Sequence, residues 1–321
     1  MTRVISTSAP GKIILSGEHF VVHGSYSLAA AISKRVYVSV REIEGTRSRI
    51  VANGLTSNIN SEDGSFPAVK TVVRTILSRA EKRFTHHPLE IAITSEIPPG
   101  SGLGSSSAVS VACAAALKDF LELPGGKENI ADIAFQGEKA VHGNPSGIDI
   151  QASFRGGLIL FKKGQETRSI ELPKPFRLLV VFSGRKRSTS KLIAKVAQTK
   201  SEYPHYFQRL ADSVSELSLA ISSMAKTREI EKMGSLFATA QTQLAWIGVS
   251  TPQLERLIEY LYGKEEVFGA KLTGAGGGGS VIVAVRQDSI DSVLDFVSDR
   301  YPYSFVSEIP QEGLRWERTK S

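Results

Sequence analysis

The sequence contains a single cysteine, Cys113, among 321 residues. One cysteine cannot form an internal disulfide, and proteins without disulfides are typical of the reducing cytosol. A lone cysteine with six scattered histidines also supplies no ligand cluster of the spacing that zinc sites use. Because Cys113 lies in the apolar run of residues 112–115, we interpret it as a small buried hydrophobe. A disulfide scaffold and a cysteine-rich zinc site are therefore excluded.

Long hydrophobic runs are also absent. The longest apolar segment, residues 108–117, is interrupted by Ser110 and is well short of the ~20 residues that a membrane-spanning helix needs. The first ten residues contain no apolar stretch of secretory length, and the charged Lys12 and Glu18 follow closely. We therefore expect a cytoplasmic protein without a membrane-spanning segment.

Aromatic residues do not accompany the basic ones. The chain carries a formal net charge of +7 and a pI near 9.4, which suits an anionic ligand without identifying it. The compact basic cluster, Arg185 to Arg187 followed by Lys191, has no interleaved aromatic side chains of the kind that stack on bases. We therefore expect no nucleic-acid partner.

What the sequence does contain is enough apolar material for two domains. Its 321 residues exceed the ~100–200 of a typical domain, and 41% hydrophobic and 22% charged residues are ordinary for globular proteins. Residues 66–84 have the apolar spacing of an amphipathic helix, and residues 108–121 are apolar nearly all round, as in a buried helix. Short β-rich runs surround them, at residues 4–6, 13–15, 36–40, 89–94 and 158–161.

A proline-rich segment divides the chain. Pro173 and Pro175 remove backbone donors and stiffen residues 171–175, so we place a domain boundary there, between residues 1–170 and 171–321. Mixed helical and strand patterns predict an α+β fold for each half. In the second half the helical patterns are at residues 191–201, 205–224, 227–245 and 252–262, and the strand patterns at 270–272 and 280–285.

The most informative segment joins a predicted strand to the buried helix, with the sequence EIPPGSGLGSSSA at residues 96–108. Glycines let the backbone approach a ligand, and the first N–H groups of a helix bind phosphate oxygens. The glycines at 100, 102 and 104 fit neither the P-loop nor the Rossmann pattern, so both of those folds are disfavoured. By itself the segment predicts a phosphate-binding loop, with a glycine-rich turn and helix cap as the alternative.

Three further segments accompany this loop: SAPGKIILSGEHFVVHG at 8–24, GEKAVHGNPSGID at 137–149 and KLTGAGGGGS at 271–280. In this order the sequence resembles the GHMP kinases, a family of ATP-dependent small-molecule kinases that carry three such motifs. The resemblance spans residues 10–280. It implies a two-domain α+β fold with an N-terminal ribosomal-S5-like domain, a C-terminal ferredoxin-like domain and the active site between them.

Within that family, residues 10–12, 17–24 and 142–149 are most similar to the mevalonate kinases. Galactokinases have arginine in place of Lys12 and a Thr-Asp-Tyr or Ile-Asp-Tyr stretch after the histidine, which is absent here. The resemblance therefore implies an enzyme that phosphorylates mevalonate with ATP and uses Mg²⁺.

The resemblance assigns catalysis to Asp149 and Lys12. Phosphoryl transfer asks the protein mainly for positioning and charge compensation, with a base near the acceptor hydroxyl. Asp149 matches the family's base, and Lys12 matches the cation that pairs with it and lowers the pKa of the hydroxyl. The alternatives are an ordinary helix N-cap for Asp149 and a solvent-exposed strand lysine for Lys12.

The same resemblance assigns the nucleotide and metal sites. Glu138 and Ser105 match the family's magnesium ligands, with Ser106 as a close competitor for Ser105, and such oxygen ligands suit Mg²⁺ bound to ATP phosphates. Glu138 could instead be a surface helix residue paired with a neighbouring lysine or histidine. The residues expected to bind ATP are Pro99, Gly100, Ser101, Gly102, Leu103, Gly104, Ser105, Ser106, Ser107, Gly274, Ala275 and Gly276.

The acceptor site is expected beside Glu18 and His19, which lie in the motif that borders it in the matching kinases. His19 is expected to hydrogen-bond the substrate. Thr189 matches a threonine near the substrate and Asp149, although through a shorter motif. The glycine loop at 274–279 is expected to close over the first glycine loop from the other domain.

Other functions stay open. Phosphomevalonate kinase and homoserine kinase are the alternatives within the family, and a diphosphomevalonate-decarboxylase-like activity is more distant because those relatives lack the Gly-Glu-His pattern of residues 17–19. A non-catalytic sensor of ATP and a metabolite would be free to lose Lys12, Glu138 and Asp149, all of which are present. An RNA-binding protein with the S5-like fold is least favoured. The sequence leaves the oligomeric state open, with a homodimer as one option.

Overall fold

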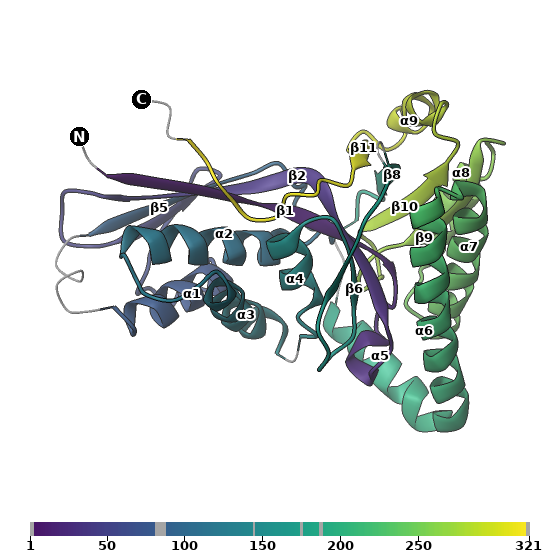
Figure 1. Cartoon of the computed structure of the whole chain (residues 1–321), viewed down its shortest axis with the longest axis horizontal. Helices are drawn as coiled ribbons and strands as arrows, with labels where there is room; N and C mark the ends of the chain where they lie inside the picture. Colours follow the sequence, from purple (N-terminus) through teal and green to yellow (C-terminus); the bar gives the residue numbers. More distant parts are fainter. Residues whose placement is uncertain (1–2, 81–87, 144, 174–175, 186–188, 319–321) are drawn as a thin grey trace.

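The computed structural model describes residues 3–80, 88–143, 145–173, 176–185 and 189–318, with the side chains of residues 189–191 set aside. Three predicted features lie partly outside these residues: the end of the 66–84 helix, Lys174 and Pro175 of the linker, and Lys186 and Arg187 of the basic cluster. The described chain forms two units that lie side by side, each a sheet covered by helices (Figure 1).

The first unit is built on a mainly antiparallel sheet. Its strands are β1 (Val4–Ser16), β2 (Ser27–Glu42), β3 (Arg49–Ala52), β4 (Leu55–Asn58), β5 (Leu89–Ser95), β6 (Leu158–Phe161), β7 (Arg168–Ile170) and β12 (Arg315–Trp316). The order is β12-β1-β2-β5-β3-β4, with β6 paired to the start of β2 and β7 paired to β6. The long β2 therefore serves two partners, β6 with its first residues and β5 with its later ones.

The strand β1 is continuous, whereas the sequence pattern predicts separate strands at residues 4–6 and 13–15. Its register with β2 shifts between Pro10 and Lys12, so a bulge takes up the residues that cannot continue a regular ladder. Glycine is required at position 11, because a Cβ there would lie 2.6 Å from the carbonyl oxygen of Leu103. The bulge thus brings β1 against the glycine loop.

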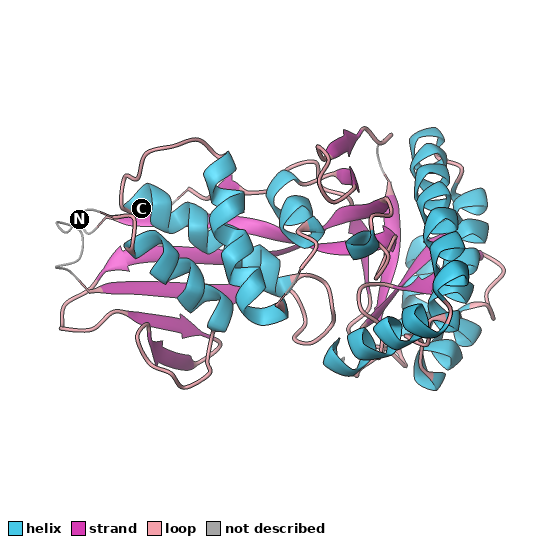
Figure 2. Ribbon diagram, turned by 90° about the horizontal axis from the view of Figure 1, so that it is seen from below, coloured by secondary structure: helices cyan, strands magenta, loops and turns pink. Residues whose placement is uncertain are grey.

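Four helices cover one face of this sheet (Figures 1 and 2), namely α1 (Pro67–Leu77), α2 (Ser105–Phe120), α3 (Glu128–His142) and α4 (Ile148–Arg155). The predicted burial of α2 on all sides is confirmed, since residues 111–117 are 0% exposed. Cys113 is among them, and burial raises the pKa of its thiol to about 12, as expected for a packing residue and not for a nucleophile.

The second unit has a four-stranded antiparallel sheet in the order β11-β8-β10-β9. Its strands are β8 (Arg177–Phe182), β9 (Val267–Leu272), β10 (Ser280–Val285) and β11 (Phe305–Glu308). Its helices are α5 (Thr189–Glu202), α6 (Pro204–Thr227), α7 (Ile230–Trp246), α8 (Pro252–Leu261) and α9 (Ile290–Ser298). Figure 1 shows α6 and α7 as long helices that lie side by side along one side of the molecule.

The two units share an apolar core. The cluster that contains α2 and the first sheet continues to Leu178, Val180 and Ile282 of the second sheet and to Phe237 of α7. The opposite face of the second sheet packs in a separate cluster around residues such as Leu179. Residues at the junction of the two units are therefore held in place by apolar packing in both units.

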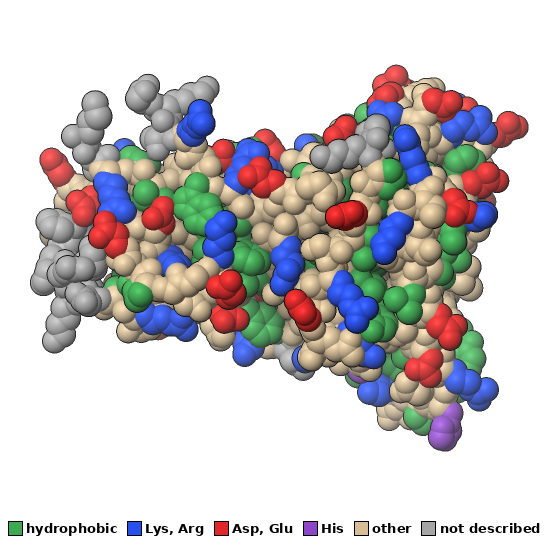
Figure 3. Space-filling model, viewed as in Figure 1, with side chains coloured by type: hydrophobic (Ala, Val, Ile, Leu, Met, Phe, Trp, Pro, Cys, Tyr) green, Lys and Arg blue, Asp and Glu red, His purple; other side chains and the backbone are tan. Residues whose placement is uncertain are grey.

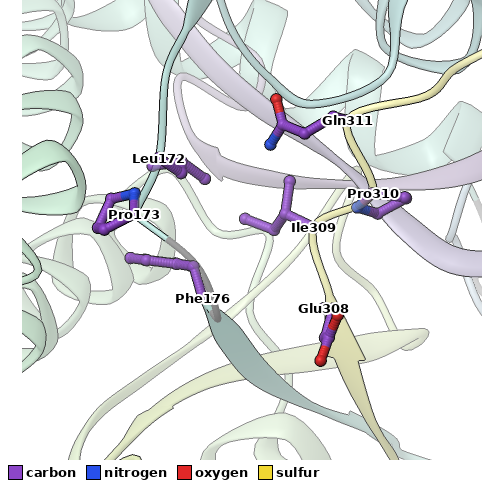
Figure 4. Close-up of a pocket in the computed structure, with 7 residues that line it drawn as sticks. All are labelled: Leu172, Pro173, Phe176, Glu308, Ile309, Pro310 and Gln311. Carbon is purple, nitrogen blue, oxygen red and sulfur yellow. The ribbon is translucent and has the colours of Figure 1, made fainter.

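Two connections cross between the units, and they lie next to each other. One is the segment around Leu172, Pro173 and Phe176, and the other is residues 308–311, with a cavity of about 360 Å³ between them (Figure 4). After the second crossing the chain returns to the first sheet, where Trp316 of β12 pairs with Thr7 of β1. Residues 315–316 thus lie in the first sheet although they follow the second unit in sequence.

None of the helices in the described part of the chain is long and apolar enough to cross a membrane. On the face shown in Figure 3, basic and acidic side chains are interspersed. The net charge of +7 is therefore not gathered into one basic patch on that face.

Candidate active site

The glycine loop connects β5 to the N-terminus of α2. Gly100, Gly102 and Gly104 have φ angles of 74°, 81° and 78°, in the left-handed region that glycine adopts at little cost. Gly104 is the N-cap of α2, and no side-chain hydrogen bond caps this end of the helix. The first backbone N–H groups of α2 are therefore left for another acceptor, as in phosphate sites at helix N-termini.

Lys12 lies beneath this loop. Its side chain comes from the bulged part of β1 and is 2% exposed, and its backbone N–H donates to the carbonyl oxygen of Leu103 at 2.8 Å. Its Nζ lies 3.0 Å from Oδ2 of Asp149. The alternative of a solvent-exposed strand lysine is excluded by this burial.

Asp149 comes from the first turn of α4. The N-cap of that helix is Gly147, so Asp149 stands two residues inside the helix and is not its N-cap. Its side chain is 23% exposed, in contrast to the buried Lys12 with which it pairs. The pair therefore presents a carboxylate that a ligand can reach and a cation that is fixed behind it.

Glu138, from α3, is 4% exposed, which excludes the alternative of a surface helix residue. Its Oε2 is buried and has no hydrogen-bond partner among the described residues, and the same holds for the hydroxyl of Ser106. Burial, with a smaller contribution from the nearby negative charge of Asp149, raises the pKa of Glu138 to about 8.

Such unpartnered buried oxygens need an explanation, and a bound cation is one. Oxygen atoms are what Mg²⁺ prefers, so Glu138 and Ser106 fit this metal. Of the two serines considered from the sequence, Ser106 has a buried hydroxyl without a hydrogen-bond partner among the described residues. The described residues contain no group of three or more histidine, cysteine or acidic side chains that could hold a metal alone. The arrangement suits a metal that takes further ligands from a nucleotide.

The buried Glu138 predicts a specific pH dependence of stability. The folded, metal-free protein keeps a proton on Glu138 up to about pH 8, whereas the unfolded chain releases it near the ordinary value of 4.5. Stability therefore falls as pH rises through this window. We expect Glu138→Gln to be more stable than the parent at pH 9 and to lose less stability between pH 6 and pH 9. Urea unfolding of both proteins without metal or nucleotide measures this, and equal pH dependence would contradict it.

Glu18 and His19 follow β1 and meet the second unit. Glu18 forms an ion pair with Lys271 of β9, and their side chains are 2% and 0% exposed. Nε2 of His19 lies 3.0 Å from the carbonyl oxygen of Ala275, in the second glycine loop. The structure thus brings both residues to the junction of the two units, with the Glu18 carboxylate directed at Lys271.

The second glycine loop lies against the first. The hydroxyl of Ser280 donates to the carbonyl oxygen of Ser101 at 3.0 Å, and a Cβ at Gly279 would lie 3.0 Å from the same oxygen. Gly276 packs against the backbone of Val249, where a side chain would collide. The two glycine loops, one from each unit, are therefore in contact. Gly274, Ala275 and Gly276 lie in the chain between the end of β9 and this contact.

Thr189 begins α5, and its side chain lies outside the described residues. The structure also brings Lys271 and Thr273 into the site; both lie in the motif at residues 271–280, but the sequence analysis gave them no role. The hydroxyl of Thr273 accepts from the backbone N–H of Ile14 at 2.7 Å and donates to its carbonyl oxygen at 3.1 Å. The signal in the sequence that could have identified Lys271 is that it is a lysine within the otherwise apolar strand VFGAKL.

Known protein families and structures match both halves of this chain. Residues 68–157 match the N-terminal domain of the GHMP kinases, and residues 227–302 match the GHMP kinase C-terminal domain. The chain is 37% identical over 312 residues to the mevalonate kinase of Archaeoglobus fulgidus, covering 97% of this chain and 99% of the relative. It is 32% identical over 328 residues to the mevalonate kinase of Aeropyrum pernix, covering 99% of both. The crystal structure of L. major mevalonate kinase in complex with R-mevalonate matches with a TM-score of 0.79 and 26% identity, over 94% of both chains.

Proposed function

Since this chain belongs to the GHMP kinase family, we propose that it transfers the γ-phosphoryl group of ATP to mevalonate, forming 5-phosphomevalonate and ADP. The fold is the two-domain GHMP kinase fold of mixed helices and sheets. Relatives that match over nearly the whole chain are mevalonate kinases, and a structural match holds R-mevalonate. The observation that carries the proposal is the Lys12–Asp149 pair beside the first glycine loop.

In this proposal Asp149 accepts the proton of the acceptor hydroxyl as its oxygen attacks the γ-phosphorus and the bond to the ADP oxygen breaks. Lys12 holds the Asp149 carboxylate in place at 3.0 Å and supplies positive charge near the reacting oxygens. Because Lys12 is 2% exposed and packed by the loop, its charge needs little rearrangement during the reaction. These are the positioning and charge-compensation roles that phosphoryl transfer requires.

The nucleotide is proposed to bind along the first glycine loop, residues 99–107, with its phosphates at the N-terminus of α2 and with Gly274, Ala275 and Gly276 approaching from the second unit. Mg²⁺ is proposed to be held by Glu138 together with Ser106, where it would neutralise negative charge on the transferring phosphate. Support comes from the unpartnered oxygens of these two residues. The acceptor is proposed to lie near His19, with its hydroxyl next to the Lys12–Asp149 pair.

An acceptor panel tests this function. We expect Mg²⁺-dependent ADP release with mevalonate at a rate far above that with phosphomevalonate, homoserine or galactose. The measurement is a coupled ADP assay with each acceptor at several concentrations, with a control that lacks acceptor to subtract ATP hydrolysis. Equal or greater activity with phosphomevalonate or homoserine would overturn the choice of acceptor and keep the kinase. No ADP release with any acceptor would overturn both.

A further inference from the structure

The turn at residues 17–19 places a non-glycine residue in a left-handed backbone conformation. Gly17 and His19 both have positive φ angles, 97° and 62°. Gly17 tolerates this, and no side chain would fit there because a Cβ would collide with Ser27. His19 is not a glycine, and a left-handed conformation at such a residue is strained and persists only where its surroundings impose it.

The surroundings that impose it come from the second unit. Lys271, Thr273 and Ala275 alternate along the end of β9 and the loop that follows, and each contacts the first unit. Lys271 pairs with Glu18 and also donates to the carbonyl oxygens of Ile14 at 3.3 Å and Leu272 at 2.7 Å. The three protons of its ammonium group thus have three acceptors. Thr273 brackets the backbone of Ile14, and the Ala275 carbonyl meets His19.

The Glu18–Lys271 pair joins the two units through charges that are removed from water. Burial raises the pKa of Glu18 and lowers that of Lys271, and each charge partly offsets the effect on the other. Buried ion pairs of this kind often contribute no more stability than apolar residues of the same size. A contribution to stability alone therefore does not explain why charges stand here.

The pair lies within the same charged array as the Lys12–Asp149 pair. The positive charge of Lys12 lowers the pKa of Glu18 and also that of Lys271, so both groups are near enough to interact with it. Lys12 in turn bonds Asp149. Lys12 therefore interacts electrostatically with the Glu18–Lys271 pair while it pairs with Asp149.

We propose that Lys271 is a positioning residue for phosphoryl transfer, which acts through Glu18 to fix the turn that presents His19 to the acceptor. In this proposal Glu18 does not contact the substrate, in contrast to the expectation from its motif. The acceptor site is complete only when the second unit is in place, because Lys271 and Ala275 hold residues 18 and 19. The inference rests on the proposed function in one respect, the assignment of His19 to the acceptor.

A double-mutant cycle tests the proposal with the full-length protein. Lys271→Met leaves the buried Glu18 unpaired and is expected to destabilise the protein strongly. Lys271→Met combined with Glu18→Gln removes both charges and is expected to recover most of that stability. The KM for the acceptor should nevertheless stay raised by about tenfold or more, with the KM for ATP within about twofold of the parent. A purely structural role makes stability and acceptor KM recover together, and that outcome would overturn the proposal.

The matched control applies the same two substitutions to a surface pair, Lys232→Met with Glu229→Gln, whose side chains are 70% and 31% exposed. This variant should change neither KM. If the buried double variant fails to fold by circular dichroism, Glu18→Gln alone serves, because it keeps the size of the side chain and an oxygen that can accept from Lys271. It should raise the KM for the acceptor and leave that for ATP, and equal changes in both would overturn the proposal.

Backbone hydrogen exchange separates this inference from the proposed function, because it needs no substrate. In the parent the amides of Phe20 and Val21 donate to the carbonyl oxygens of Glu18 and Gly17 in the turn, and the amide of Ser25 donates to that of Phe20, which follows the turn. The exchange of these amides should be faster in the buried double variant and unchanged in the Lys232→Met, Glu229→Gln control. Unaltered exchange would overturn the positioning role whatever the acceptor is. Faster exchange in a protein whose parent phosphorylates no acceptor would support the positioning of the turn while the proposed function fails.

Discussion

Asp149→Asn is expected to lower turnover by roughly 10²–10⁴-fold, the range typical of a lost general base, with ATP affinity and melting temperature near the parent's. Asparagine keeps the size of the side chain and can still accept a hydrogen bond from Lys12, whose Nζ lies 3.0 Å from the aspartate. What it loses is the negative charge and the ability to take up a proton. Steady-state kinetics with mevalonate and separate measurement of ATP binding check both parts of the expectation.

The control for this variant is Asp291→Asn. Asp291 is also the second residue of a helix, α9, and also pairs with a cation, Arg177, at 3.1 Å. It differs in being 72% exposed, against 23% for Asp149. Its replacement should leave turnover unchanged. Turnover of Asp149→Asn within a few-fold of the parent would remove Asp149 from the mechanism.

Gly104→Val is expected to abolish ATP binding and turnover in a protein that still folds. A Cβ at this position would lie 2.7 Å from Cγ and 3.2 Å from Cε of Lys12, so even the first atom of a side chain displaces Lys12. A valine would also fill the space at the start of α2 that we assign to phosphate. Calorimetric titration with ATP and the ADP assay measure the two losses.

A matched glycine separates this effect from backbone strain. Gly54 has the same φ angle as Gly104, +78°, and a Cβ there would meet nothing within 4 Å. Gly54→Val therefore carries the strain of a left-handed valine without displacing Lys12. We expect it to lose stability and to keep ATP binding. Unchanged ATP affinity in a well-folded Gly104→Val protein would return the loop to its alternative, a glycine-rich turn.

The parts of the fold that the sequence predicted are those with a long, regular apolar pattern. The helices expected at residues 205–224, 227–245 and 252–262 correspond to α6, α7 and α8 with shifts of a few residues at the ends. The eight-residue α4 was not predicted, although it carries Asp149, because two turns contain too few apolar positions to establish a period. The strand β12 was not predicted either, because its two residues pair with β1 about 300 residues away.

The sequence by itself determined the family and the two glycine loops, and it predicted the reacting residues. These depend on residue type and on spacing within short segments, which are visible without a structure. The resemblance predicted that Lys12 pairs with Asp149 and that the two glycine loops meet, as they do through Ser280 and Ser101. Only the tertiary structure decided that Glu18 pairs with Lys271. The partners in each case are more than a hundred residues apart and come from different elements. Their contact depends on how the two sheets pack around a shared core, a long-range consequence of burial that no local pattern of residues encodes.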